Sequence, residues 1–179
     1  MMTDDFPKYG IPSDVVVGLA FKALFGLRRN FRQDALRCIG RLEPPLRVFG
    51  EENIPGSGPC VVTVNHYYRP GFGAWWIALA VAATVPVEMH WVTTGELTYL
   101  GRLGSPLSGW ALSRIAWTYG FTNMPPMPPR PEDVEARARS VKKVLTLLKQ
   151  TGNIVLGLAP EGGDQRNGRL TLPPSGAGR

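Results

Sequence analysis

Short runs typical of strands, of which Cys60–Val64 is rich in β-branched residues, alternate along this chain with segments that have the apolar spacing of helices. The runs predicted as strands are Leu46–Phe49, Cys60–Val64, Val87–Val92 and Ile154–Leu158. The segments predicted as helices are Asp14–Leu42, Phe72–Ala83, Glu96–Thr118 and Pro131–Thr151, the third with an interruption near Gly101–Pro106. Because strands that alternate with helices pair in parallel, we predict an α/β fold with a mostly parallel sheet flanked by helices.

The length of the chain limits the number of domains. With 44% apolar residues, 179 residues are enough for one core and too few for two ordinary domains. Residues 1–45 are interpreted as an N-terminal amphipathic basic helix that packs on the domain or on a membrane interface, and residues 46–179 as the α/β domain. The opening residues have no apolar core followed by small residues, so no secretory signal is predicted.

The cysteines and the apolar stretches bear on location. Cys38 and Cys60 have neither the spacing of a metal site nor the density of a disulfide scaffold, which fits a reducing compartment. The longest apolar stretches are shorter or more interrupted than the roughly 20 residues that a membrane span needs. A cytoplasmic protein that does not span a membrane is therefore expected.

The segment between Lys22 and Arg47 carries most of the net charge of +6. The basic residues on the polar side of its predicted helix are Lys22, Arg29, Arg32, Arg37 and Arg41. This pattern is typical of a helix that lies in a membrane interface, and equally of a helix that covers a core. Nucleic-acid binding is not favoured, because exposed aromatics between the basic residues and a known reader motif are both lacking.

The polar pair Asn65 and His66 directly follows a predicted strand. Ligands of parallel sheets bind where strands end in loops. An imidazole there could take a proton from an attacking hydroxyl, or it could be a structural histidine bonded to backbone. His90 lies inside an apolar strand, and we interpret it as structural.

A second polar cluster, Glu161-Gly162-Gly163, follows the last predicted strand. Its carboxylate could orient a polyol while the N–H groups of the turn approach a phosphate, and Arg166 adds a cation suited to phosphate contact. Taken by itself, such a sequence is more often an ordinary tight turn in a solvated loop. A catalytic role for both clusters requires that His66 and Glu161 face a shared cleft at the rim of the sheet.

The order and spacing of these segments resemble the glycerol-3-phosphate and 1-acylglycerol-3-phosphate (lysophospholipid) acyltransferase family. The stretch from Val48 to Pro55, with Gly58-Pro59 and the apolar run to Asn65-His66, is similar to the segment that leads into the family's first motif. Leu158-Ala-Pro-Glu-Gly-Gly163 resembles its Pro-Glu-Gly motif. The resemblance covers about Arg47 to the C terminus and implies a glycerolipid acyltransferase-like fold.

The resemblance also implies an activity. A family member moves a fatty acyl group from acyl-CoA or acyl carrier protein to the hydroxyl of a lysophospholipid or glycerol-phosphate acceptor, with no metal or cofactor, in phospholipid biosynthesis. His66 is then implied as the general base and Glu161 and Gly162 as ligands of the acceptor. Arg166 is expected near the phosphate, with Asn65 and Gly163 also lining the site. A place on the cytoplasmic membrane surface follows from the lipid acceptor.

One departure from the family pattern concerns the partner of the histidine. The family's aspartate, five positions after the histidine, is Gly71 here, and glycine cannot bond the imidazole. In a serine hydrolase, replacing the corresponding carboxylate costs about ten-thousand-fold in turnover, so Glu88, Glu96 or a water would have to substitute. The alternative function is a degenerate homologue that binds lipid or acyl thioester without transferring the acyl group.

Two further departures concern the middle motif and the end of the chain. The arginine expected after a strand near Tyr119–Asn123 is missing, and Arg130 is the nearest candidate. The chain stops at Arg179, before the family's final strand, so an incomplete sheet with an unpaired edge is expected.

Overall fold

A computed structural model describes residues 8–67, 72–126 and 130–162. Within them lies a sheet of parallel strands in the order β1-β4-β2-β3. The strands are β1 (Cys60–Thr63), β2 (Met89–Thr94), β3 (Thr122–Met124) and β4 (Val155–Leu158). The prediction of an α/β fold with a mostly parallel sheet is thus confirmed for the described residues. Strand β4, although last in sequence, lies between β1 and β2 and pairs with both.

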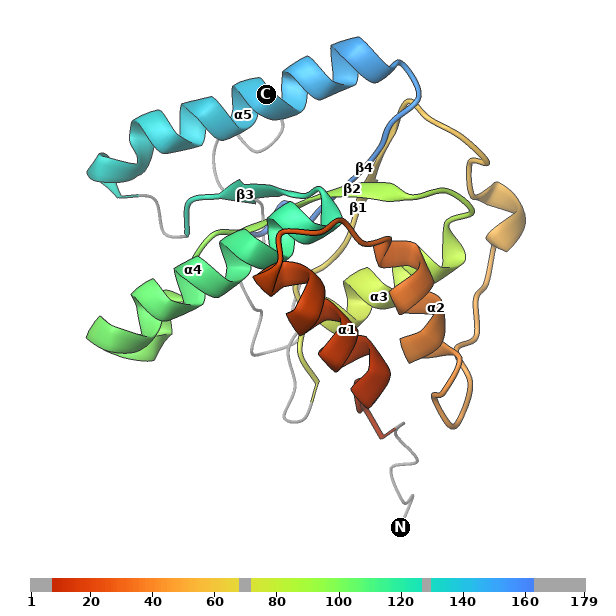
Figure 1. The fold of residues 1–179 in the computed structure, drawn as a ribbon. Coiled ribbons are helices and arrows are strands. Elements are labelled where there is room, and N and C mark those ends of the chain that lie inside the picture. The colour runs from red at the N-terminus through yellow and green to blue at the C-terminus, as the bar shows by residue number, and fades with distance from the viewer. Residues whose placement is uncertain (1–7, 68–71, 127–129, 163–179) are drawn as a thin grey trace.

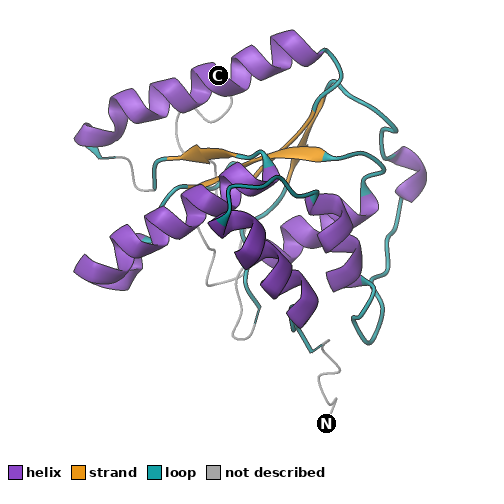
Figure 2. Cartoon of the chain, in the orientation of Figure 1, coloured by secondary structure: helices purple, strands orange, loops and turns teal. Residues whose placement is uncertain are grey.

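The helices form two unequal layers around this sheet (Figure 1). They are α1 (Ser13–Leu24), α2 (Phe31–Ile39), α3 (Trp75–Thr84), α4 (Gly101–Tyr119) and α5 (Val134–Thr151), with short 3-10 turns at Glu51–Asn53, Thr98–Leu100 and Pro131–Asp133. Helices α1 to α4 lie on one side of the sheet and α5 lies on the other (Figure 2). The main core therefore forms between the sheet and α1 to α4.

The predicted strand Leu46–Phe49 is wrong. These residues form an irregular segment in the structure, and Phe49 is 83% exposed. A short run with strand-forming side chains becomes a strand only where a neighbouring strand pairs with its backbone and a core buries its side chains. The sequence pattern indicates only that residues 46–49 favour an extended backbone, and it does not show whether another strand is available to pair with them.

The single predicted helix Asp14–Leu42 is also wrong, because the chain turns between α1 and α2. Gly26 has a φ of +63°, a conformation that side chains rarely adopt, and Asn30 caps α2 by accepting a hydrogen bond from the N–H of Gln33 at 2.7 Å. The carboxylate of Glu88 accepts two further bonds, from the N–H groups of Phe31 and Arg32. The turn lets α2 pack on α3 while α1 packs on α4.

The predicted interruption of the third helix is found at Gly101, whose φ of +74° separates the 3-10 turn Thr98–Leu100 from α4. Helix α4 continues through Pro106, which stands in its second turn. Two serines tie this half of the helix to the preceding segment: the Ser105 hydroxyl donates to the carbonyl of Leu97, and the N–H of Leu97 donates to the Ser108 hydroxyl, both at 3.0 Å. These bonds hold the first half of α4 against the segment that follows β2.

A buried ion pair joins the turn after α1 to α2 and α4. The carboxylate of Asp34, 2% exposed, accepts hydrogen bonds from the Arg29 guanidinium and from the Tyr119 hydroxyl, the latter at 2.8 Å. Burial, together with the neighbouring carboxylate, raises the pKa of Tyr119 well above its usual range. Phe31 packs edge-on against Tyr119 and Phe121 beside this network, with ring centroids about 5 Å apart in each pair.

Candidate functional site

The pairing of β1 with β4 determines where the two polar clusters lie. The strands run parallel in register, with Thr63 opposite Leu158, and the N–H of Val64 continues the ladder by donating to the carbonyl of Leu158 at 3.0 Å. The chain leaves both strands at the same edge of the sheet. The segment that contains Asn65 and His66 therefore lies beside the segment that leads to Glu161.

A hydrogen bond joins these two segments directly. The backbone N–H of His66 donates to Oε2 of Glu161 at 2.9 Å, across 95 positions of sequence. Both residues are half-buried, whereas Asn65 and Gly162 are exposed beside them. The structure thus brings together Asn65, His66, Glu161 and Gly162, four of the six predicted site residues. Gly163 and Arg166 lie outside the described residues, as does Gly71.

The carboxylate of Glu161 performs a definite task in this geometry. A hydrogen bond to an ionised acceptor is roughly twice as strong as one between neutral groups, so the bond holds the backbone that carries the imidazole of His66. A carboxylate has about four lone-pair sites, and one of them suffices for this bond. Gly162, with a φ of +69°, turns the chain after the carboxylate and donates its N–H to the carbonyl of Ala159.

The structure excludes Glu88 as a replacement for the missing aspartate. Glu88 precedes β2 and therefore lies at the opposite end of the parallel sheet from His66, which follows β1. Both of its carboxylate oxygens are bonded to the first N–H groups of α2. Its role is to stabilise the start of that helix, where an acidic group is favourable.

Glu96 lies at the correct end of the sheet but at a different strand. It follows β2, which is separated from β1 by β4, so the two strand ends are about 10 Å apart. Its carboxylate pairs with the guanidinium of Arg130 at 3.4 Å.

Arg130, the candidate for the missing motif arginine, is held by acidic neighbours. Its Nε donates to Asp133 at 2.8 Å, and it also pairs with Glu96 and, at 3.9 Å, with Glu132. The hydrogen bond to Asp133 is the main cause of the raised pKa of Arg130. To bind a phosphate, this guanidinium would have to exchange carboxylate contacts that already neutralise its charge.

The second histidine is engaged within the sheet. Nε2 of His90 lies 2.8 Å from the hydroxyl of Thr122 on β3. Burial, with a smaller effect of Lys143 on α5, lowers the pKa of His90. This ring is therefore kept neutral between β2 and β3, in a different place from the His66 segment.

An aromatic cluster that the sequence did not indicate lies beside His66. The ring of Tyr67 is 6.1 Å from that of Phe72, which is 5.0 Å from Tyr9, and Tyr9 is 5.3 Å from Trp76. Tyr9 comes from the N-terminal segment and Trp76 from α3, so three distant parts of the chain form one apolar wall. Tyr67 and Phe72 are five positions apart, whereas Tyr9 is more than 50 positions from either, so no local pattern brings the three together.

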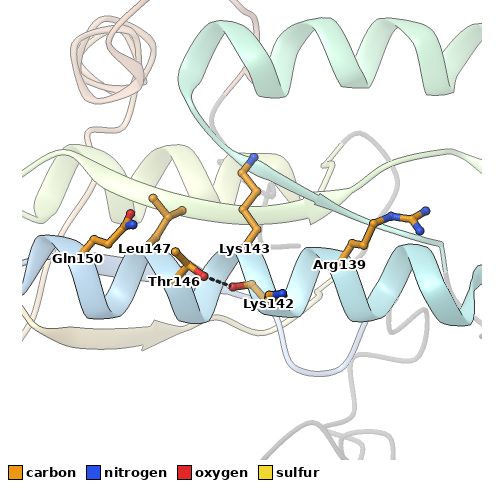
Figure 3. A pocket seen from close by; sticks show the side chains of 6 residues that line it. All are labelled: Arg139, Lys142, Lys143, Thr146, Leu147 and Gln150. Atoms are coloured by element: carbon orange, nitrogen blue, oxygen red, sulfur yellow. Dashed lines mark hydrogen bonds between the residues drawn. The ribbon is translucent and has the colours of Figure 1, made fainter.

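Two surface hollows lie along α5, away from the strand ends. One is lined by residues of α5 alone: Arg139, Lys142, Lys143, Thr146, Leu147 and Gln150 (Figure 3). A second, with Arg130, Val134 and Val141 among its lining residues, lies along the same helix. Both are shallow and contain none of the predicted site residues. The candidate site is therefore defined by the strand ends and their hydrogen bond, not by these hollows.

The part of the chain that the structure describes lacks both a group of metal ligands and a membrane-spanning helix. In that part of the chain, no three His, Cys, Asp or Glu side chains are grouped so as to hold a metal ion. None of the helices described is both long and apolar enough to cross a bilayer.

Fold and site together define an α/β protein with a parallel sheet and a histidine–glutamate contact at the carboxyl edge of that sheet. Comparisons with protein-family models, curated proteins and solved structures give no match for the chain.

Proposed function

We propose that this protein is an O-acyltransferase that moves a fatty acyl group from acyl-CoA or acyl carrier protein to the hydroxyl of a lysophospholipid or glycerol-phosphate acceptor. The observation that supports the proposal most is the hydrogen bond between the N–H of His66 and the carboxylate of Glu161. It joins the two segments whose sequences resemble separate motifs of the glycerolipid acyltransferases. The protein would work in the cytoplasm at a membrane surface, where such acceptors are found.

The imidazole of His66 would act as general base. It takes the proton of the acceptor hydroxyl while that oxygen attacks the thioester carbonyl. The C–S bond of the thioester then breaks, the new ester forms, and the thiolate receives the proton from the imidazolium. Glu161 holds the main chain at His66 during these steps, and the aromatic cluster of Tyr67 and Phe72 offers apolar surface beside the reacting atoms.

A second candidate function is favoured by the position of Glu88. Since its carboxylate caps α2 at the far end of the sheet, the most obvious substitute for the aspartate missing at Gly71 is removed. Gly71 stands where the resemblance implies an aspartate that stabilises the imidazolium, and the loss of that carboxylate is expected to slow turnover. The second candidate is therefore a homologue that binds lipid or acyl thioester without transferring the acyl group.

Acyl transfer to lysophosphatidic acid, assayed with acyl-CoA and with acyl carrier protein as donors, tests the proposal. We expect His66→Ala to lower turnover by about 100-fold or more, whereas the control His90→Gln leaves it within a few-fold. Gly71→Asp should raise turnover. Activity that appears only in Gly71→Asp supports the second candidate, and equal turnover of wild type and His66→Ala would remove His66 from the mechanism.

A further inference from the structure

Helix α4 carries an apolar stripe that no other described element covers. Leu103, Leu107, Trp110 and Trp117 are 89%, 66%, 55% and 46% exposed. Their spacing of four, three and seven residues places them on one face of the helix. At 1.5 Å per residue, the stripe is about 21 Å long. This is more than the scattered single apolar residues that are normal on protein surfaces.

The charged side chains that the structure describes on α4 itself or over the rings of the stripe are arginines. The only charged residues of α4 are Arg102 and Arg114, and both are exposed. The guanidinium of Arg114 lies over the ring of Trp110 at 5.9 Å, and that of Arg28 lies over Trp117 at 4.3 Å. Tryptophan prefers the headgroup level of a bilayer, and arginine side chains cover apolar surface while their charge reaches lipid phosphates.

The N-terminal half of α4 lies at the end of the sheet that carries His66. Helix α4 starts shortly after β2 ends, and all strands run parallel, so α4 begins at the same edge as the His66 segment. The hydrogen bonds of Ser105 and Ser108 to Leu97 fix this half of the helix to the segment after β2. A surface bound by Leu103 and Leu107 would therefore lie at the carboxyl edge of the sheet.

We propose that the α4 stripe binds the surface of an anionic lipid bilayer, with the apolar side chains among the acyl chains and Arg114 and Arg28 at the headgroups. A bilayer fits better than a protein, because the stripe is a protruding ridge with side chains up to 89% exposed rather than a groove. Lipid packs around a ridge of any shape, whereas a protein partner needs a complementary groove. The choice of a lipid rests in part on the proposed function.

Cosedimentation with vesicles of phosphatidylglycerol and phosphatidylcholine, compared with vesicles of phosphatidylcholine alone, tests this surface. Wild type should bind the anionic vesicles more tightly. The double variant Leu103→Ser, Leu107→Ser should weaken binding at least about tenfold, and Arg114→Glu should weaken binding to anionic vesicles selectively. Val141→Ser, Leu145→Ser provides the matched control, since these side chains of α5 are 44% and 52% exposed, and it should bind as wild type does.

Three results would overturn the inference: no vesicle binding by wild type, equal binding by the α4 double variant, or an equal loss in the α5 control. Concentration-dependent dimerisation that the α4 variant abolishes, without vesicle binding, would assign the stripe to a second copy of the chain instead. His66→Ala should bind vesicles like wild type. If acyl transfer is absent while this binding pattern holds, the proposed function fails and the α4 surface stands.

Discussion

At the scale of single residues, two roles are open for Glu161: binding the acceptor or positioning His66. The resemblance to acyltransferases implies contact with the acceptor, whereas the structure shows its carboxylate bonded to the backbone of His66. If the residue positions His66, Glu161→Ala should lower kcat by about tenfold or more with little change in the KM for the acceptor. Glu161→Gln keeps an acceptor oxygen and should recover part of the rate. A raised acceptor KM with unchanged kcat would assign the carboxylate to substrate binding.

The position of Gly157 has no room for a side chain, and the sequence pattern alone does not predict this. It lies on β4 opposite Trp91 of β2, and an added Cβ would be 2.6 Å from the Trp91 ring. Gly157→Ala should therefore lower the free energy of unfolding by about 1 to 3 kcal/mol through overpacking. Urea denaturation measures this, with Gly56→Ala as control because a Cβ there meets nothing within 4 Å. Equal midpoints for both variants would contradict the contact.

At the scale of elements, the sequence predicts the helices and strands that depend on local residue patterns. It does not predict the ends and breaks that depend on contacts with distant parts of the chain. Strand β1 and helix α5 lie close to the predicted ranges, because a β-branched run and an apolar stripe at helical spacing are local signals. The break between α1 and α2 combines local features, Gly26 and the Asn30 cap, with a distant one that the helical spacing does not show: Glu88, 57 positions from Phe31. Strand β3 has three residues, too few to show a period.

Substitutions in the buried hydrogen-bond network of Asp34 give the strongest test of how α1, α2 and α4 pack together. Asp34→Ala would leave Arg29 and Tyr119 without their acceptor among α1, α2 and α4, and breaking a buried ion pair costs about 3 to 5 kcal/mol. Tyr119→Phe removes only one hydrogen bond and should cost about 1 kcal/mol. Chemical denaturation followed by circular dichroism distinguishes the two. A cost for Asp34→Ala no larger than that for Tyr119→Phe would show that the ion pair contributes little.

At the scale of the whole molecule, the site depends on strand order. The strand-end rule predicts that polar residues after parallel strands share an edge, but only neighbouring strands bring them into contact. The insertion of β4 between β1 and β2 decides that Glu161 meets His66 while Glu96 lies two strands away. Strand order depends on how the helices pack on both faces of the sheet. The sequence of a single segment does not reveal this packing.

The same edge of the sheet links membrane docking to catalysis. If α4 holds the sheet edge against the bilayer, acceptors embedded in vesicles reach His66 only after docking, whereas a short-chain acceptor in solution does not need it. Leu103→Ser, Leu107→Ser should therefore lower turnover about tenfold or more with vesicle-embedded lysophosphatidic acid, and leave turnover with a soluble short-chain analogue within about twofold. Equal losses with both acceptors would mean that the substitutions damage the site itself, and docking would then play no part in substrate access.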